Sequence, residues 1–405
     1  MRTVGIICEY NPFHNGHKRQ IDILRDMGYD CIVSVMSGNF TQRGELSMFD
    51  KYTRAECAIL GGSDLVLELP FPYCSLSAEG FARSGVHILS SLGIKDISFG
   101  SECADVNLLR RAADAISTKE FVTAYSDIQK KSSSGSAKAY FDALGKTLGE
   151  DVALLSNDIL AISYISAIKC LGIDMNVVPI KREGLAYNDR SLIEGELPSA
   201  SAIRRSLIGA GGKASLDGYV PDKVSKRLSL ASDQGFAPVS VNNIEREILS
   251  FFKLMTSTEI TSRAISRSGG GSTVAQDGCG ICERLSNCAR DADSFDEFLS
   301  RAYNSKYTNA RINRVILFSL LGVSDAAAAS LPEYTTLLAA DESGRTLLSQ
   351  LRKGCNFNVV TKPADAPVGV QSNILRAADE VYARAMPNRY SSDFFVKCKP
   401  YMAVK

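Results

Sequence analysis

The sequence predicts an α/β fold in its first half, namely a parallel sheet with a helical insertion. The second half is predicted to be mainly helical and to end in a small α/β module. Short apolar segments alternate with amphipathic ones in the first half, which is typical of strands joined by crossover helices. Glycine-containing loops follow several of these segments, as they do at the ligand-binding edge of such sheets. The 405 residues, 45% of them hydrophobic and 22% charged, suffice for two domains, predicted at 1–215 and 216–405.

Apolar runs rich in β-branched residues mark the predicted strands. The first run begins at Thr3 and leads directly into a polar loop at residues 9–17. Pro70 ends the third run, and Pro179 lies near the end of the fifth, which places that strand at an edge or a bulge. The predicted strands cover residues 3–8, 30–36, 64–69, 96–99 and 175–180.

Helices are predicted between these strands. Ile21 and Leu24 lie three positions apart among charged residues, which gives the first helix one apolar face. A second helix ends at the glycine pair 61–62, and Asn157 can cap the start of a later one. Further helical segments are predicted at 78–92 and, with a polar break at 130–136, in an insertion at about 104–150.

Two of the three histidines in the chain, His14 and His17, lie in the first loop between a strand and a helix. Pro12 limits where the helix can begin, and Gly16 lets the backbone come close to a ligand. Both imidazoles would stand at a helix N-terminus, where free N–H groups and the helix dipole favour anions. Because imidazoles can donate hydrogen bonds to phosphate oxygens, the loop predicts a polyphosphate site.

A second candidate for phosphate binding lies at residues 199–205. Ser199 or Ser201 would cap a helix that carries Ile203 on its inner face, with Arg204 beside the cap. A capped helix start with an arginine can receive phosphate, although such starts are common in proteins without a ligand. The histidine loop upstream favours the phosphate interpretation.

The second half contains one basic stripe. Residues 300–324 have no acidic side chain, and their basic residues are interleaved with Tyr303 and Tyr307. Such a stripe can contact the phosphate backbone of RNA, or it can be an ordinary solvated helix face. The candidate RNA-binding residues are Arg301, Lys306, Arg311 and Arg314.

Composition sets limits on the partners and the compartment. The net charge of +1 gives no global field that attracts nucleic acid. There is no apolar run long enough to cross a membrane and no signal-peptide pattern, so the expected location is the cytoplasm, without a membrane partner. The eleven cysteines are scattered and are interpreted as reduced thiols. Because Cys279, Cys282 and Cys288 lack a fourth ligand nearby, no structural metal is expected.

The histidine loop resembles the HxGH motif of the nucleotidyltransferase superfamily, whose members act at the α-phosphate of a nucleotide. The serine-rich turn followed by Ile203 and Arg204 resembles the second motif of that superfamily. Over roughly its first half, the chain resembles the bacterial tRNA(Met) cytidine acetate ligase family, and the resemblance continues more weakly to the C-terminus. The segments that carry it are 4–17, 36–45, 64–70, 99–102 and 199–204, then 306–308, Arg311 and Arg314.

The resemblance implies a Rossmann-like nucleotidyltransferase domain that forms acetyl-adenylate from acetate and ATP. It implies transfer of the acetyl group to the wobble cytidine of elongator tRNA(Met), which gives N(4)-acetylcytidine. His14 and His17 would be catalytic at the α- and β-phosphates, and Arg204 with residues 199–201 would hold the β/γ end. Mg2+ would accompany ATP through phosphate oxygens, and the loop 38–44 would be a candidate lid.

The ATP-binding residues expected from this resemblance and from the two motifs cluster in the first loop and at later strand ends. They are Ile7, Cys8, Glu9, Tyr10, Asn11, Pro12, Phe13, His14, Asn15, Gly16, His17, Lys18, Arg19, Gln20, Gly100, Asn157, Arg182, Glu183, Ser201 and Arg204.

Two other functions fit parts of the sequence. A nucleotidyltransferase that adenylylates a small phosphorylated metabolite would use both phosphate motifs but would not need the second half of the chain. A non-enzymatic RNA-binding module with a relic nucleotide site would use the basic stripe alone. ATP turnover that depends on acetate separates the three hypotheses. The sequence predicts no oligomeric state.

Overall fold

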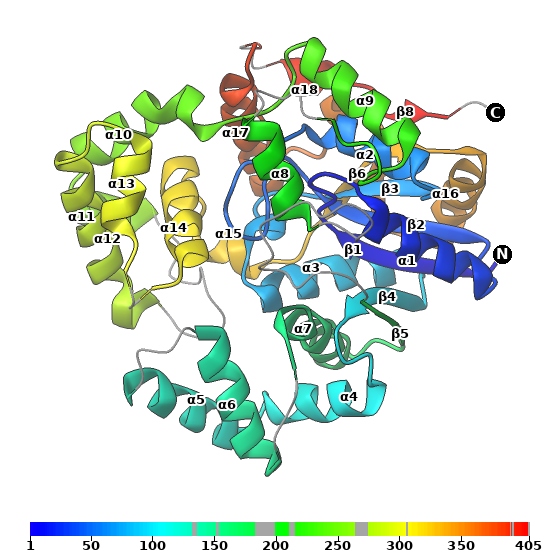
Figure 1. The fold of residues 1–405 in the computed structure, drawn as a ribbon, viewed down its shortest axis with the longest axis horizontal. Helices are drawn as coiled ribbons and strands as arrows, with labels where there is room; N and C mark the ends of the chain where they lie inside the picture. The colour runs from blue at the N-terminus through cyan, green and yellow to red at the C-terminus, as the bar shows by residue number, and fades with distance from the viewer. Residues whose placement is uncertain are drawn as a thin grey trace.

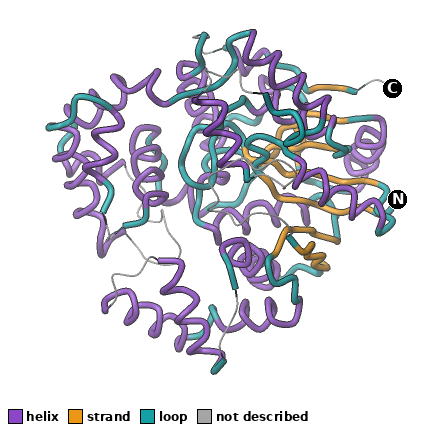
Figure 2. The backbone as a smooth tube through the Cα atoms, viewed as in Figure 1, coloured by secondary structure: helices purple, strands orange, loops and turns teal. Residues whose placement is uncertain are grey.

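The computed structural model describes most of the chain, and all structural statements below concern the described residues. These are residues 1–131, 136–150, 154–182, 199–209, 215–263, 274–304, 307–388, 390 and 393–403. Strands gather in one part of the molecule and helices surround them (Figures 1 and 2).

One mostly parallel sheet forms the centre of the fold, in the order β5-β4-β1-β2-β3-β6-β7, with β8 also paired to β6. Among the strand pairs that the described residues form, β3–β6 is antiparallel and the others are parallel. The predicted α/β fold is confirmed, and each predicted strand lies within two residues of its observed limits. The strands are β1 (Thr3–Cys8), β2 (Cys31–Ser37), β3 (Leu65–Leu69), β4 (Asp96–Ser101), β5 (Asn176–Lys181), β6 (Tyr334–Ala340), β7 (Asn358–Val360) and β8 (Tyr401–Met402).

The strand order reverses at β1. The chain runs from β1 to β2 and β3 on one side, then returns to place β4 and β5 on the other side. The carboxyl ends of β1 and β4 therefore flank a crevice where the loops diverge, and ligands bind such sheets there. The loop after β1 is the one that carries His14 and His17.

Helices cover both faces of the sheet because successive strand residues point to opposite sides. Val4 and Ile6 pack with helices α1 and α2 in one core cluster, whereas Ile7 packs with α3 and α7 in the other. The helices of the first half are α1 (Asn15–Asp26), α2 (Lys51–Leu60), α3 (Ala78–Ser91), α4 (Val106–Ala115), α5 (Lys119–Lys131), α6 (Ser136–Leu148), α7 (Ser156–Cys170) and α8 (Ala200–Gly209), with the 3-10 turn η1 (Tyr73–Ser75).

The second half is helical until β6, as predicted, and α10 to α14 lie to one side of the sheet in Figure 1. Its last strands extend the sheet of the first half: β6 pairs with β3, and β7 and β8 pair with β6. The helices are α9 (Asp222–Asp233), α10 (Glu245–Leu254), α11 (Ser257–Arg263), α12 (Val274–Arg290), α13 (Phe295–Ala302), α14 (Asn309–Leu321), α15 (Asp325–Ala329), α16 (Glu342–Gly354), α17 (Val370–Ala385) and α18 (Phe394–Lys397), with the 3-10 turns η2 (Val241–Ile244) and η3 (Pro363–Asp365).

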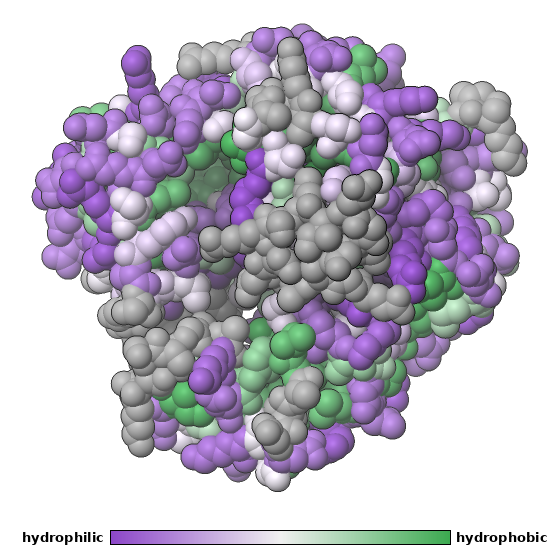
Figure 3. All heavy atoms as spheres, viewed as in Figure 1, coloured by the Kyte–Doolittle hydropathy of each residue, from purple (hydrophilic) through white to green (hydrophobic). Residues whose placement is uncertain are grey.

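Hydrophilic residues dominate the coloured part of the face shown in Figure 3, and apolar residues appear there in several separate places. In the described parts of the chain, none of the helices combines the length and apolarity needed to span a bilayer. The division of the chain near residue 215 stays a prediction, although strands from both sides of it share one sheet.

Candidate nucleotide site

His14 and His17 form a reciprocal cap at the start of α1. The Nδ1 atom of His14 accepts a hydrogen bond from the Gly16 N–H, at 3.0 Å, and Nδ1 of His17 accepts one from the His14 N–H, at 3.2 Å. The two rings stack with their centroids 3.7 Å apart. A Cβ atom on Gly16 would lie 2.9 Å from the His14 ring, so glycine lets this ring fold back onto the helix start.

The cap changes how this helix start can bind an anion. The N–H groups of Asn15 and His17 also have acceptors, the carbonyls of Tyr219 and His14. The expectation of free N–H groups at this helix start is therefore wrong for the first turn, because the capping interactions occupy them. The helix dipole and the imidazoles remain to attract phosphate.

Both imidazoles are neutral at physiological pH. Burial, together with the positive charges of Arg182 and Arg204, lowers the pKa of His14 to about 3. Burial, repulsion between the two rings if both were charged, and the charge of Arg182 likewise lower the pKa of His17 well below its usual range. A neutral ring whose Nδ1 accepts a hydrogen bond carries its proton on Nε2. Each ring therefore has Nε2–H as a donor.

Aromatic packing fixes the ring of His17. Tyr10 and Phe13 lie beside it, with ring centroids 4.8 Å and 5.6 Å from that of His17. The Tyr10 hydroxyl lies 3.4 Å from the Ser34 hydroxyl on β2, so the loop is bonded to the neighbouring strand. Tyr10 also has a φ of 46°, which is uncommon for a residue with a side chain and occurs most often at constrained functional loops.

Arg204 joins the second phosphate motif to the histidine loop. Its Nη1 donates to the Asn11 carbonyl at 2.8 Å, and its Nη2 donates to the Ser201 hydroxyl at 3.3 Å. Ser199, rather than Ser201, makes the capping contact of α8, because its Oγ accepts from the Ala202 N–H at 3.1 Å. The two motifs that the sequence singled out, about 190 residues apart, therefore meet.

The carboxyl end of β4 contributes Gly100. A Cβ atom there would lie 3.2 Å from the Arg182 side chain, so Arg182 crosses over this strand end. The electrostatic effect of Arg182 on both histidines places its charge near them. Gln20 donates to the Ser98 hydroxyl on β4 at 3.1 Å and ties α1 to the same strand.

Asn157 lies at the start of α7, where sequence analysis did not anticipate a carboxylate. Its N–H and side-chain amide both donate to Glu102, which follows β4. Asp158 is fully buried and accepts from the Ser101 hydroxyl at 2.6 Å. This local network fixes the start of α7 beside the β4 loop, and Asn157 in it is already bonded to protein.

The other predicted nucleotide residues have different surroundings. Ile7 and Cys8 are buried in the sheet, and Pro12 is buried in the loop. Asn15 donates to the Gly218 carbonyl at 2.7 Å, Lys18 pairs with Asp22, and Arg19 is exposed. Glu183 lies outside the described residues.

Comparisons with known proteins identify the family. The family model described as HIGH Nucleotidyl Transferase matches residues 1–394. A protein of Caldanaerobacter subterraneus subsp. tengcongensis named tRNA(Met) cytidine acetate ligase is 33% identical over 413 residues, which cover 98% of each chain. This chain belongs to the tRNA(Met) cytidine acetate ligase family.

A relative of the same name from Thermoanaerobacter sp. (strain X514) is 32% identical and covers 89% of each chain. Among solved structures, Thermotoga maritima TmcAL bound with alpha-thio ATP is 29% identical, covers 99% of each chain and superposes with a TM-score of 0.84. The apo form of the same protein gives the same values. The fold and the family predicted from the motifs are confirmed.

In this member of the tRNA(Met) cytidine acetate ligase family, Arg54 on α2 lies behind the histidine loop, although no motif in the sequence marks it. The residue is 1% exposed, and the partners of its guanidinium among the described residues are main-chain carbonyls. Nε donates to Phe49 at 2.8 Å and Nη1 to Glu9 at 2.6 Å. Nη2 donates to Ser37 at 3.1 Å and also to Gly38. One guanidinium thus joins the ends of β1 and β2 to the segment before α2.

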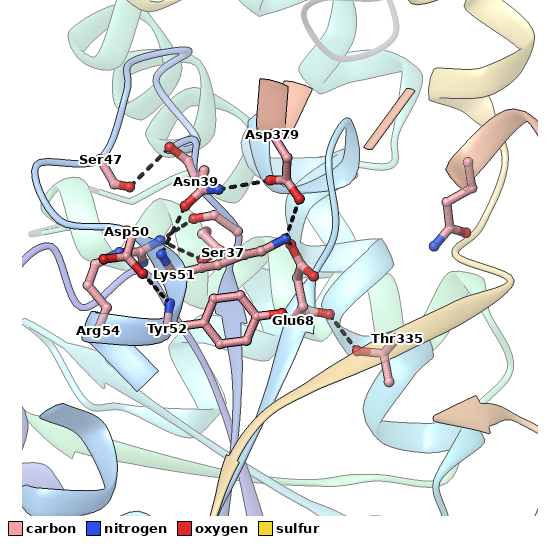
Figure 4. A network of polar contacts seen from close by, with 12 residues as sticks. Ser37, Asn39, Ser47, Asp50, Lys51, Tyr52, Arg54, Glu68, Thr335 and Asp379 are labelled. Atoms are coloured by element: carbon pink, nitrogen blue, oxygen red, sulfur yellow. Dashed lines mark hydrogen bonds and ion pairs between the residues drawn. The ribbon is translucent and has the colours of Figure 1, made fainter. Parts of the chain in front are cut away.

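A buried polar network lies beneath the loop after β2 (Figure 4). The Lys51 ammonium lies 2.8 Å from Glu68 Oε1 and 2.6 Å from Asp379 Oδ2. Asn39 donates to Asp379 at 2.8 Å and accepts from the Lys51 N–H at 2.9 Å. Burial and the charge of Glu68 raise the pKa of Asp379 to about 6, against the opposing effect of Lys51. Charge patterns within a single segment cannot reveal such a network, because α17 supplies one partner.

The predicted RNA-binding residues differ in their exposure. Arg301 is exposed and pairs with Glu297 one helical turn away. The Arg311 guanidinium lies over the Tyr307 ring, 5.3 Å from its centroid. Arg314 is 7% exposed and donates to the Gln42 carbonyl. Lys306 lies outside the described residues.

The cysteines show no disulfide among the residues described. Cys282 is buried, Cys288 is half-buried, and the side chain of Cys279 lies outside the described part of the chain. In that part, no cluster of three or more His, Cys, Asp or Glu side chains has an arrangement that could hold a metal ion.

Proposed function

We propose that this protein is an ATP-dependent acetate ligase that acetylates the wobble cytidine of elongator tRNA(Met). Acetate and ATP form acetyl-adenylate and pyrophosphate, and the acetyl group then passes to the exocyclic amine of the cytidine. The observation that carries the proposal is the stacked, neutral pair His14 and His17, with Arg204 bonded to the same loop. Membership of the family and the alpha-thio ATP bound to the related Thermotoga maritima protein support it.

The first step needs positioning and charge stabilisation more than covalent help from the protein. An acetate oxygen attacks the α-phosphorus in line, and the bond to the bridging oxygen of pyrophosphate breaks. The Nε2–H groups of His14 and His17 would donate to the phosphate oxygens on which negative charge grows. Arg204 and Arg182 would hold the anionic tail, and ATP would enter as its Mg2+ complex.

The second step requires RNA beside the acyl-adenylate. The amine nitrogen attacks the acetyl carbonyl carbon, AMP departs, and the nitrogen loses a proton. Arg301 and Arg311, on α13 and α14, are the proposed phosphate contacts among the described residues, with Lys306 between them in sequence. Each such contact adds salt-dependent affinity without sequence specificity.

Incubation with ATP, labelled acetate and elongator tRNA(Met) tests the proposal. Label is expected in the RNA as N(4)-acetylcytidine, and His17→Ala is expected to abolish its transfer. Label that stops at acetyl-adenylate would contradict the RNA half of the proposal. Pyrophosphate exchange that ignores acetate but responds to a phosphorylated metabolite would instead favour a metabolite nucleotidyltransferase.

A further inference from the structure

Residues 41–45 form a tight turn that lies against helix α14. The Thr41 N–H donates to the Glu45 carbonyl at 2.9 Å, and the Gly44 N–H donates to the Thr41 carbonyl at 3.0 Å. Gly44 has a φ of 73°, and a Cβ atom there would lie 2.6 Å from the backbone nitrogen of Arg314. Because only glycine fits this contact without displacement, the turn is packed directly on the helix backbone.

The main chain of Gln42 joins this helix to the nucleotide loop. Its N–H donates to Glu9 Oε1 at 2.8 Å, and its carbonyl accepts from Nη1 of Arg314 at 3.2 Å. Burial lowers the pKa of Arg314 to about 10, so the side chain stays charged at neutral pH. This hydrogen bond from a buried, charged donor holds the peptide of Gln42 in place.

The other side of the turn faces the phosphate-binding residues. Glu9 follows β1, leads into the histidine loop and gives its carbonyl to Arg54. The positive charge of Arg204 lowers the pKa of Glu45, which burial raises, so these two side chains are close. The turn therefore contacts α14 on one side and the candidate nucleotide site on the other.

We infer that Arg314 is a positioning residue of the ATP site. It holds the Gln42 carbonyl, so that the Gln42 N–H fixes the Glu9 carboxylate and, through it, the backbone that enters the histidine loop. The inference rests on the proposed function and deepens it. It assigns Arg314 to the activation of acetate, which precedes acetyl transfer to RNA, and makes the turn a fixed support rather than a lid.

Two assays separate this role from a direct RNA contact. The first is acetate-dependent ATP–pyrophosphate exchange without RNA, and the second is tRNA affinity measured over a range of salt concentrations. Arg314→Met is expected to lower kcat/KM for ATP in the exchange by about 10- to 100-fold, because a small displacement of positioned groups has effects of this size. Arg314→Lys should retain part of the activity. The tRNA affinity and its salt dependence should not change.

The matched control is Arg384→Met. Arg384 is an exposed arginine of α17 that pairs with Glu380 one helical turn away, and it lies outside the proposed sites. The Arg384→Met variant should give the wild-type value in both assays. A double variant tests whether Arg314 acts through Glu9. Glu9→Ala removes the acceptor of the Gln42 N–H, so the double variant Glu9→Ala, Arg314→Met should lower kcat/KM no more than the more damaging single variant does.

Several results would overturn the inference. Unchanged exchange in Arg314→Met, with weaker tRNA binding and a salt slope smaller by about one, would make Arg314 an RNA phosphate contact. If the loss of kcat/KM in the double variant equals the product of the two single losses, Arg314 does not act through Glu9. If Arg314→Met fails to fold in thermal unfolding, Arg314→Lys gives the same comparison. If the wild-type protein shows no acetate-dependent exchange, the proposed function is overturned instead. The affinity of the variants for an ATP analogue would then still decide the role of Arg314.

Discussion

His14 and His17 each use one ring nitrogen to cap α1, which leaves the other as an N–H donor. Burial and the charge of Arg182 keep both rings neutral, and the charge of Arg204 adds to the effect on His14. The arrangement gives two uncharged donors with fixed tautomers at the end of β1. It needs no proton transfer before phosphate binds, and the arginines supply the positive charge.

Replacement of His14 separates helix capping from phosphate binding. Asparagine is a good N-cap residue without an Nε2–H donor at the imidazole position. His14→Asn should keep the free energy of unfolding within about 1 kcal/mol of wild type, whereas His14→Ala should lose roughly 1–2 kcal/mol in urea unfolding. Both should lower acetyl-adenylate formation by about 100- to 1,000-fold. Wild-type activity in His14→Asn would exclude a role for the imidazole.

The protonation state of the pair can be observed directly, because the chain has only three histidines. The pKa of His14 near 3 and the lowered pKa of His17 predict that both rings are neutral at neutral pH, with the proton on Nε2, and that His14 stays neutral down to about pH 5. Long-range nitrogen–proton NMR spectra of the ATP-free protein measure this. His87→Asn removes the third signal and assigns the pair. Imidazolium signals from either ring at pH 6 would contradict the prediction.

At the level of elements, the helix α2 holds the strand ends together. Arg54 donates to the carbonyls that follow β1 and β2, and Lys51, at the start of the same helix, bonds to β3 and α17. These buried cations replace water as partners for groups that the loops would otherwise leave unsatisfied. The loops at the ligand edge therefore depend on a helix behind them.

The network around Asp379 should make stability depend on pH. Burial raises the pKa of this carboxyl to about 6 in the folded protein, above the value of about 3.9 expected in the unfolded chain. The folded state therefore binds the proton more tightly. The stability that this proton contributes is full below about pH 4 and is lost as the pH rises through 6, a change of about 3 kcal/mol.

Asp379→Asn should remove this contribution. As the pH rises from 4 to 7, the free energy of unfolding of the wild type, measured in urea, should fall relative to that of the variant. Glu380→Gln, at the adjacent exposed position, should follow the wild-type curve. Parallel curves for wild type and Asp379→Asn would show that this carboxyl titrates normally in the fold.

For the whole molecule, the decisive feature is that one sheet contains strands from both halves of the chain. Thr335 on β6 donates to the Glu68 carbonyl on β3, and Asp379 reaches the Asn39 side chain. Asn15, at the start of α1, bonds to residues 218 and 219. The second half thus completes the core on which the nucleotide loops stand.

A fragment of residues 1–215 is therefore expected not to fold cooperatively, because the β3 edge would lose its partner strand and the core would be open. Urea unfolding followed by circular dichroism, together with binding of an ATP analogue, measures this. Co-expression with residues 216–405 should restore both properties. The control is the full chain with a protease site inserted at 210–214 and cut after folding, which should stay associated. Cooperative unfolding and nucleotide binding by the lone fragment would contradict the expectation.

The sequence by itself determined the strands of the first half, the histidine loop, the second phosphate motif and the family. These features are local: they depend on hydrophobic periodicity, on proline and glycine, and on the order of residues in short motifs. The tertiary structure decided that Arg204 contacts Asn11 and that Arg54 and Glu102 support the site. It also decided that Arg314 is buried and that β6 pairs with β3 in the sheet of the first half. Lys51 and Asp379 are 328 positions apart, and no pattern within either segment specifies such a contact, because folding alone brings the two segments together.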